Sequence, residues 1–293
     1  MKQTALVLGA GGQLGRELLA AAGADIDCVA LMRSELDVGD RVAVARCLAE
    51  RAPQLLVNAA AYTAVDRAET EAAACWRSNA EGPANLALAC RDLGIRLLHV
   101  STDFVFDGSA TTPYSTLAPT APLGEYGRSK LAGEQAIQRL LPSALVVRTG
   151  WLYSRFGSNF VKTMLRLMSQ RDEISVVADQ TGTPTWAGGL AQALWAAARR
   201  PALRGVYHWS DAGECSWYDF AVAIHQEASA LGLLTRPVTI RPIAASEYPT
   251  AARRPAYSVL DKTSSWRDLE LPAVDWRVQL HRMLTDLKES SDE

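Results

Sequence analysis

The sequence has no surplus of charge of either sign. Its 30 lysines and arginines against 32 aspartates and glutamates give a formal net charge of -2. The basic residues are dispersed rather than gathered in a stripe, which argues against a nucleic-acid partner. Long hydrophobic runs are also missing: no stretch approaches the length of about 18 apolar residues that a membrane span requires. We therefore expect neither a nucleic-acid nor a membrane partner.

Cysteine is scarce, odd in number and widely spaced. The five residues form no Cys-x-x-Cys pair, which argues against a disulfide framework or a zinc site. The four histidines show no ligand spacing, and single carboxylates such as Glu17 do not make a cation site. We expect isolated thiols and no metal.

The N-terminus lacks the long apolar region and the cleavage site of a signal peptide, so we expect a cytoplasmic protein. With 293 residues, 48% of them apolar, the chain is long enough to bury a sizeable core in one large or two modest domains.

The first half of the chain alternates between two patterns. Short runs that are apolar throughout indicate strands with both faces covered, and the segments between them have helical periodicity. Strands are expected at 4–8, 26–32, 55–57, 96–101 and 145–148, and helices at 13–22, 41–51, 71–93 and 123–141. This alternation predicts an α/β fold with a Rossmann-type, doubly wound parallel sheet.

After Gly150 the alternation is less regular, and prolines and tryptophans become frequent. Helices are expected at 160–167, 190–198, 216–231 and 274–287. We interpret residues 1–150 as a Rossmann domain, a fold typical of dinucleotide-binding proteins. Residues 151–293 are expected to form a smaller mixed α/β domain that mainly binds substrate, with some segments returning to the sheet.

A glycine cluster follows the first predicted strand directly and precedes the first predicted helix. It has the form Gly9-x-x-Gly12-x-x-Gly15 and includes Gln13 and Leu14. Glycine permits a sharp turn and a close approach of the backbone to a pyrophosphate at the positive end of the helix. The pattern predicts a dinucleotide site, although an ordinary glycine-rich turn after a strand is the simpler alternative.

The end of the second predicted strand sets the choice of cofactor. An acidic residue there would bind the ribose 2′-hydroxyl of NAD, but this sequence has Arg33 followed by Ser34. A guanidinium suits the 2′-phosphate of NADP. We therefore predict NADPH, with NADH as a possible second cofactor, unless Arg33 is only a solvated loop charge. Asp37 and Val38 are expected to face the adenine.

Tyr126 and Lys130 stand four residues apart in a predicted helix, so they lie on one face about one turn from each other. A nearby ammonium favours the phenolate, which predicts a lowered pKa for the phenol. Such a pair can exchange a proton, and the alternative is an ordinary exposed pair on a helix. Thr102 and Asp103 end the fourth predicted strand, where the carboxyl ends of parallel strands meet a ligand crevice. Spacing alone does not bring these residues to Tyr126.

Several segments in order carry a resemblance that extends from residue 9 to residue 258. Together they resemble the extended short-chain dehydrogenase/reductases and, more narrowly, the dTDP-4-dehydrorhamnose reductase family. Beside the glycine cluster and Tyr126-x-x-x-Lys130, the segments are Asn58-Ala-Ala-Ala-Tyr-Thr-Ala-Val-Asp66, Ser101-Thr-Asp-Phe-Val-Phe-Asp107, Arg148-Thr-Gly-Trp151, Asp179-Gln-Thr-Gly-Thr-Pro-Thr185 and Arg254-Pro-Ala-Tyr-Ser258.

The resemblance implies hydride transfer from NADPH to C4 of dTDP-4-dehydro-L-rhamnose, which gives dTDP-L-rhamnose. It implies that Tyr126 donates the proton, that Thr102 holds the same oxygen, and that Lys130 stabilises the phenolate and binds the nicotinamide ribose. It further implies substrate contacts for Thr102, Asp103 and Trp151, and cofactor contacts for Ala61, Tyr62 and Thr63. The partner is then a small nucleotide-sugar, and the protein is a monomer or a homodimer.

Two other functions stay open. One is the reduction or epimerisation of another nucleotide-linked 4-keto sugar, and the other is a non-catalytic NADP-binding regulatory subunit. Some residues have structural alternatives: Trp151 as core, Asp103 as the cap of a turn, and Ser101 as a partner of a backbone group. Arg254 would bind the substrate's diphosphate or form a salt bridge.

Overall fold

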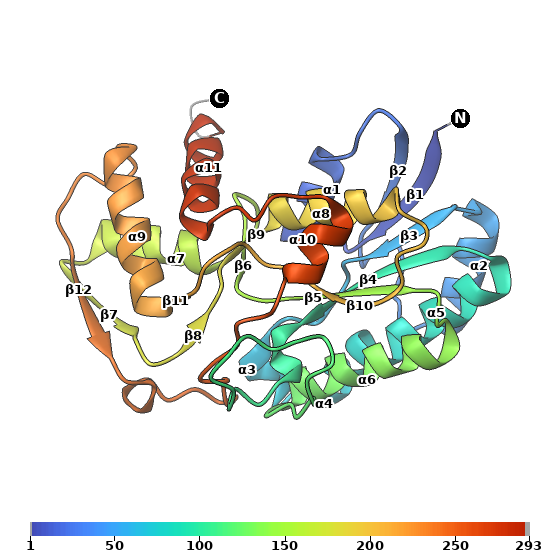
Figure 1. Cartoon of the computed structure of the whole chain (residues 1–293), viewed down its shortest axis with the longest axis horizontal. Helices are drawn as coiled ribbons and strands as arrows, with labels where there is room; N and C mark the ends of the chain where they lie inside the picture. The colour runs from blue at the N-terminus through green and yellow to red at the C-terminus, as the bar shows by residue number, and fades with distance from the viewer. Residues whose placement is uncertain (1, 291–293) are drawn as a thin grey trace.

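A computed structural model describes residues 2–290 of the chain, so residues 291–293, at the end of the second predicted region, and Met1 lie outside it. Its centre is a six-stranded parallel sheet in the order β10-β5-β4-β3-β1-β2 (Figure 1). The bounds of the strands are Gln3–Leu8 for β1, Ile26–Leu31 for β2, Leu55–Asn58 for β3, Arg96–Thr102 for β4, Leu145–Thr149 for β5 and Gly205–His208 for β10. The prediction of a doubly wound α/β fold is confirmed.

Helices cover both faces of this sheet because alternate strand residues point to opposite faces. In β1, Ala5 and Val7 pack toward one face, and Leu6 and Leu8 toward the other. The first face is covered by α1 (Gln13–Ala20) and α8 (Ala187–Ala198). The second is covered by α2 (Arg41–Arg51), α5 (Gly82–Leu93) and α6 (Glu125–Leu140). The central strands are therefore apolar throughout.

The helix predicted over residues 71–93 is confirmed in extent, since residues 72–93 are helical without a break, but it contains one widened turn. The segment consists of α4 (Ala72–Trp76), a π-helical turn (Arg77–Glu81) and α5, and a short helix, α3 (Val65–Ala68), precedes it. Pro83 has no N–H to donate to the Asn79 carbonyl, so the regular hydrogen-bond ladder is interrupted there. This widened turn brings Asn79 and Ser78 to the site described below.

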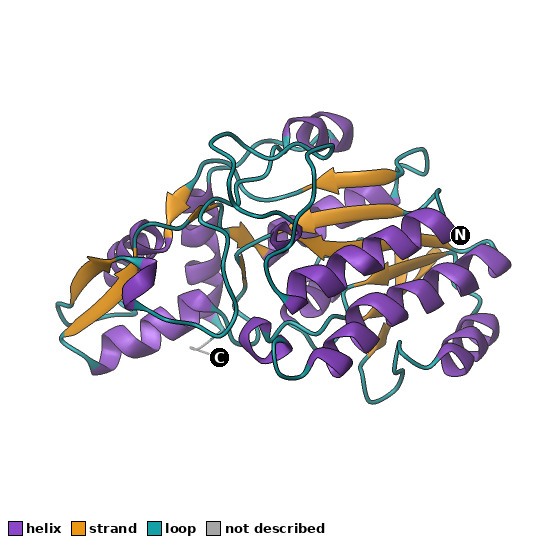
Figure 2. Cartoon of the chain, turned by 90° about the horizontal axis from the view of Figure 1, so that it is seen from below, coloured by secondary structure: helices purple, strands orange, loops and turns teal. Residues whose placement is uncertain are grey.

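The second half of the chain has a hydrophobic core of its own. Val161, Phe220 and Trp276, all fully buried, belong to it and come from three different helices. These helices are α7 (Phe160–Gln170), α9 (Trp217–Ala230) and α11 (Trp276–Glu289). A parallel strand pair, β7 (Glu173–Val177) and β12 (Thr239–Ile243), packs with them. Figure 2 shows this group beside the end of the main sheet.

Two pairs of short strands lie within the second half. Strand β6 (Leu152–Tyr153) pairs with β9 (Thr185–Trp186), and β8 (Thr181–Gly182) pairs with β11 (Cys215–Ser216). Helix α10 (Thr263–Leu269) follows near the end of the chain, and its Leu269 packs in the core of the main sheet. Strand β10 and helix α8 come from the second half of the sequence. Nevertheless, β10 pairs with β5 in the main sheet, and α8 packs on one face of that sheet. The domain boundary at residue 150 stays a prediction. Within residues 2–290, no helix combines the length and apolar character that crossing a bilayer requires.

Candidate active site

A cavity of about 620 Å³ lies at the carboxyl ends of β1, β3, β4 and β5. This is the edge at which open parallel sheets bind ligands. With one exception, every residue predicted for the site lines it. Those residues are Gly9, Gly12, Gln13, Leu14, Gly15, Arg33, Asp37, Val38, Ala61, Thr63, Thr102, Asp103, Tyr126, Lys130 and Trp151.

The glycine cluster forms the floor of the cavity at the start of α1. The Gly12 N–H donates to the Gly9 carbonyl at 2.9 Å and closes the turn. A Cβ on Gly15 would lie 2.3 Å from the same carbonyl oxygen, so only glycine fits there. No side chain caps the N-terminus of α1. Its first amides therefore have no side-chain partner, and the residues that carry them line the cavity, which suits an anion.

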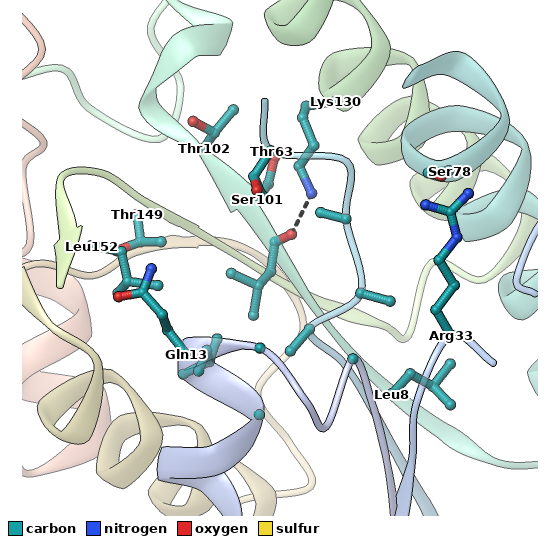
Figure 3. Close-up of a pocket in the computed structure, with 18 of the residues that line it drawn as sticks. Leu8, Gln13, Arg33, Thr63, Ser78, Ser101, Thr102, Lys130, Thr149 and Leu152 are labelled. Atoms are coloured by element: carbon teal, nitrogen blue, oxygen red, sulfur yellow. Dashed lines mark hydrogen bonds between the residues drawn. The ribbon is translucent and has the colours of Figure 1, made fainter. Parts of the chain in front are cut away.

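Arg33 lies at one end of the cavity together with Ser78, as Figure 3 shows. The nearby acidic side chains are occupied by the protein itself. Glu35 accepts a hydrogen bond from the Met32 N–H at 2.8 Å. Asp37 forms a 2.8 Å ion pair with Arg77, which keeps the pKa of that carboxyl below its usual value. No ion pair is recorded for Arg33 within residues 2–290. Ser78 was not predicted, and no sequence signal marks it.

The segment that follows β3 forms one wall, and Asn79 holds it in place. The Asn79 amide accepts a hydrogen bond from the Tyr62 N–H at 2.8 Å and donates one to the Tyr62 carbonyl at 3.0 Å. The Tyr62 hydroxyl donates to Glu71 at 2.6 Å. Ala61 and Thr63 consequently line the cavity, whereas Tyr62, the exception among the predicted residues, does not.

Lys130 and Thr102 lie at the other end of the cavity in Figure 3. Lys130 is 2% exposed, and its ammonium donates to the Val100 carbonyl oxygen at 2.7 Å. Burial lowers the pKa of Lys130 to about 8. Helix α6, which carries this lysine, is fixed to β5 by a buried ion pair between Glu134 and Arg148 at 2.7 Å. Arg148 therefore helps to hold in place the helix that carries Lys130.

The prediction that Lys130 lowers the pKa of the Tyr126 phenol is wrong for this structure. Burial raises the pKa of Tyr126 well above its usual value, and the Thr102 hydroxyl offsets this shift only in part. Desolvation disfavours the phenolate more than its neighbours stabilise it. The phenol is therefore protonated throughout the physiological pH range, which is the form that a proton donor needs.

Thr102 and Asp103 form a buried pair beside Tyr126. The Thr102 hydroxyl donates to the Asp103 carboxylate at 3.1 Å and accepts from the Phe104 N–H at 3.2 Å. Burial raises the pKa of Asp103 to about 6. The neighbouring Ser101 hydroxyl lines the cavity and has no hydrogen-bond partner among the described residues. These groups place several polar atoms at one point of the cavity.

Trp151 has a left-handed backbone conformation, with φ of 49°, which is an outlier for a bulky residue. Its indole stacks on Trp217, with ring centroids 3.4 Å apart and planes 3° apart. Trp217 lies at the start of α9, in the second half of the chain. The stack covers one face of Trp151 and leaves it a contact with the cavity.

Asn159 and Arg254 are two polar residues of the second half whose partners the structure defines. Asn159, at the start of α7, lines the cavity and donates to Gln13 at 2.9 Å, so it connects the second half to α1. Arg254 forms an ion pair with Asp66 at 2.8 Å, which is the salt-bridge alternative. In the described part of the chain, no cluster of three or more histidine, cysteine or acidic side chains is arranged to hold a metal ion.

A long cavity with a helix N-terminus in its floor and a phenol, an ammonium and hydroxyls at one end suits a dinucleotide-dependent oxidoreductase. Comparison with known proteins narrows this class. Residues 3–289 match the RmlD substrate binding domain family, and the chain belongs to that family.

Curated relatives span nearly the whole chain. A dTDP-4-dehydrorhamnose reductase of Sinorhizobium fredii is 41% identical, over 95% of each chain. A probable dTDP-4,6-dihydroxy-2-methyloxan-3-one 4-ketoreductase of Streptomyces antibioticus is 45% identical, over 96% of this chain and 95% of its own.

A crystal structure of a dTDP-4-dehydrorhamnose reductase of Bacillus anthracis in complex with NADP has a TM-score of 0.92. It is 36% identical and covers 98% of this chain and 100% of its own. Together the matches confirm the predicted family, fold class and oxidoreductase class.

Proposed function

We propose that this protein reduces the 4-keto group of dTDP-4-dehydro-L-rhamnose to give dTDP-L-rhamnose, with NADPH as reductant. The observation that carries the proposal is the convergence of Tyr126, Thr102 and Lys130 at one end of a cavity whose floor is a dinucleotide-type glycine turn. A regulatory subunit would not need this proton-transfer set, so its presence favours catalysis over the non-catalytic alternative.

The residues present fit a dinucleotide. The N-terminal amides of α1 have no side-chain cap, and a pyrophosphate would satisfy them. Because Gly15 has no Cβ, the start of α1 lies close to the Gly9 carbonyl oxygen. Ala61 and Thr63 line the cavity between its two ends. When bound, the reduced cofactor supplies the hydride.

The choice of NADPH rests on the three charged residues after β2. The Asp37 and Glu35 carboxylates are already engaged by Arg77 and by the Met32 N–H, whereas Arg33 has no ion-pair partner among the described residues. A 2′-phosphate would meet an available guanidinium rather than a free carboxylate. Use of NADH is then expected to be weaker.

The protein's own residues would stabilise and protonate the C4 oxygen as negative charge develops on it. Tyr126 donates its phenolic proton to this oxygen, a role typically worth about 10²- to 10⁴-fold in rate. Lys130, one turn further along α6, would bind the nicotinamide ribose and contribute positive charge on the side of the helix that carries the phenol. Thr102 holds the same oxygen, and Asp103 and Trp151 contact the sugar.

A second candidate substrate is another dTDP-linked keto sugar. The Streptomyces antibioticus relative, named for a different sugar, is 45% identical to this chain. Beside Thr102 and Asp103, the sugar would meet Trp151 on its Trp217 stack, which comes from the second half. We propose that residues 151–293 mainly bind substrate, that residues 1–150 hold the cofactor, and that the protein acts as a monomer or homodimer.

The test is to mix the protein with dTDP-4-dehydro-L-rhamnose and with NADPH or NADH, to follow cofactor oxidation optically, and to identify the sugar by NMR. We expect dTDP-L-rhamnose and a higher kcat/KM with NADPH. A panel of other nucleotide-linked 4-keto sugars gives the relative specificity. Faster turnover of another sugar would replace the substrate, and no oxidation with any sugar would contradict catalysis.

A further inference from the structure

The Thr102 hydroxyl has one proton, and two protein groups already use its hydrogen-bonding capacity. A threonine hydroxyl donates once and accepts twice. The Phe104 N–H uses one acceptor position, at 3.2 Å. The hydroxyl proton goes to the Asp103 carboxylate, at 3.1 Å. In this arrangement Thr102 has no proton left to donate to a substrate oxygen.

The proposed reaction requires the opposite orientation. The C4 oxygen gains negative charge, so Thr102 must donate to it, and the proton must turn away from Asp103. An ionised Asp103 holds that proton in a charge-assisted hydrogen bond. A protonated Asp103 would instead donate to the second acceptor position of Thr102 and leave the hydroxyl proton free to point at the sugar.

The surroundings of Asp103 make its protonated form easier to reach than that of an exposed carboxyl. The carboxyl is 2% exposed, and its second oxygen has no hydrogen-bond partner among the described residues. A Cβ on Gly150 would lie 2.5 Å from that oxygen, so the backbone closes over it. An unpaired, buried carboxylate oxygen is costly, and protonation removes this cost.

The groups that face Asp103 allow it to be either protonated or ionised. The Tyr126 phenol, on α6, is a titratable neighbour, and Thr102, Gly150 and Ser258 are uncharged. Ser258 and Thr102 stabilise the charged form, whereas burial opposes it more strongly, so the pKa of Asp103 is raised to about 6. Both forms of Asp103 are therefore accessible near neutral pH.

We propose that Asp103 is a positioning residue that acts in its protonated form, donating to Thr102 so that the Thr102 hydroxyl can donate to the C4 oxygen. The inference rests on the proposed function. Asp103 keeps its proton throughout, and the proton that the alkoxide takes still comes from Tyr126.

The test compares the parent with Asp103→Asn, Thr102→Val and the double variant. The asparagine amide is a permanent N–H donor with the shape of the protonated acid. For each protein, kcat is measured at saturating NADPH and sugar from about pH 5 to about pH 8.5. Thermal melts confirm that each variant is folded.

We expect Thr102→Val to lower kcat by about 10- to 100-fold at low pH, as for a hydrogen bond to a charged oxygen. The ratio of kcat for Asp103→Asn to that of the parent should rise with pH, at most by the factor that Thr102→Val costs. In the Thr102→Val background the Asp103→Asn change should have the same effect at every pH, because no hydroxyl remains to be oriented.

The outcomes separate this inference from the proposed function. If Thr102→Val slows the reaction but the Asp103→Asn ratio is independent of pH or falls with it, only the role of Asp103 is overturned. If Thr102→Val leaves kcat unchanged, the role of Thr102 fails as well. Titration of the Asp103 carboxyl carbon by NMR, without ligands, gives a second readout. A midpoint near the ordinary aspartate value of about 3.9 would also overturn the inference.

Discussion

The two ends of the cavity differ in how the protein holds their functional groups. At the Tyr126 end, Lys130, Thr102 and Asp103 are at most 5% exposed and hydrogen-bonded to the protein. At the Arg33 end, the neighbouring Met32 is 52% exposed, and no ion pair restrains Arg33 in the described chain. The first end is organised by packing before any ligand arrives, whereas the second offers a charge whose position a ligand must fix. Catalysis requires groups that are held in position in advance, whereas discrimination between cofactors tolerates a side chain that the ligand itself orders.

The largest expected effect tests the packed end. Tyr126→Phe removes only the acidic hydroxyl, so kcat should fall by about 10²- to 10⁴-fold. Binding of NADPH, measured by fluorescence titration, should change little. Tyr248→Phe, at a residue that is 62% exposed, is the matched control and should keep the parent's rate. A Tyr126→Phe enzyme as fast as the parent would remove the proton-donor role.

The second effect concerns what anchors this end. Arg148→Met leaves the Glu134 carboxylate buried without its ion-pair partner, which should cost about 3–5 kcal/mol of unfolding free energy. Urea denaturation measures it. Arg199→Met breaks an exposed ion pair with Asp25 and should cost only about 0–1 kcal/mol.

A double change sharpens this test. Arg148→Met with Glu134→Leu should recover most of the lost stability, because no uncompensated charge remains. If the double variant is as unstable as Arg148→Met alone, the loss comes from packing rather than from the buried charge.

A smaller effect tests the open end. Arg33→Ala should raise the KM for NADPH by about 10- to 100-fold, the value of about 1.5–3 kcal/mol for a charged hydrogen bond. The KM for NADH, which has no 2′-phosphate, should stay the same. Arg51→Ala, at the exposed end of α2, controls for loss of positive charge. Equal losses for both cofactors would exclude recognition of the 2′-phosphate by Arg33.

The smallest effect concerns a charge that the protein already pairs. Arg254 is bound to Asp66, and both side chains are partly exposed. Arg254→Ala should therefore lower the stability by about 0–1 kcal/mol. The KM for the nucleotide-sugar should change by less than about threefold. A much larger rise in this KM would indicate that Arg254 leaves Asp66 to bind the diphosphate.

Sequence patterns predicted most of the sheet and the lining of the cavity. Residues that end strands or form a glycine turn, such as Thr102 and Gly12, are placed by the parallel topology itself, and periodicity reports that topology locally. Strand β10 and the π-helical turn at Arg77–Glu81 escaped this reasoning. The first is defined by its pairing with β5, whereas the second has a local signal in Pro83, which interrupts the hydrogen-bond ladder of the helix.

By itself the sequence determined the doubly wound fold, the phosphate-type turn and the spacing of Tyr126 and Lys130, because each follows from local periodicity and residue type. Only the tertiary structure decided that Tyr62 turns toward Glu71, that Arg254 is paired with Asp66, and that the pKa of Tyr126 is raised rather than lowered. The physical reason is that a side chain's partners and its desolvation depend on segments far away in the chain.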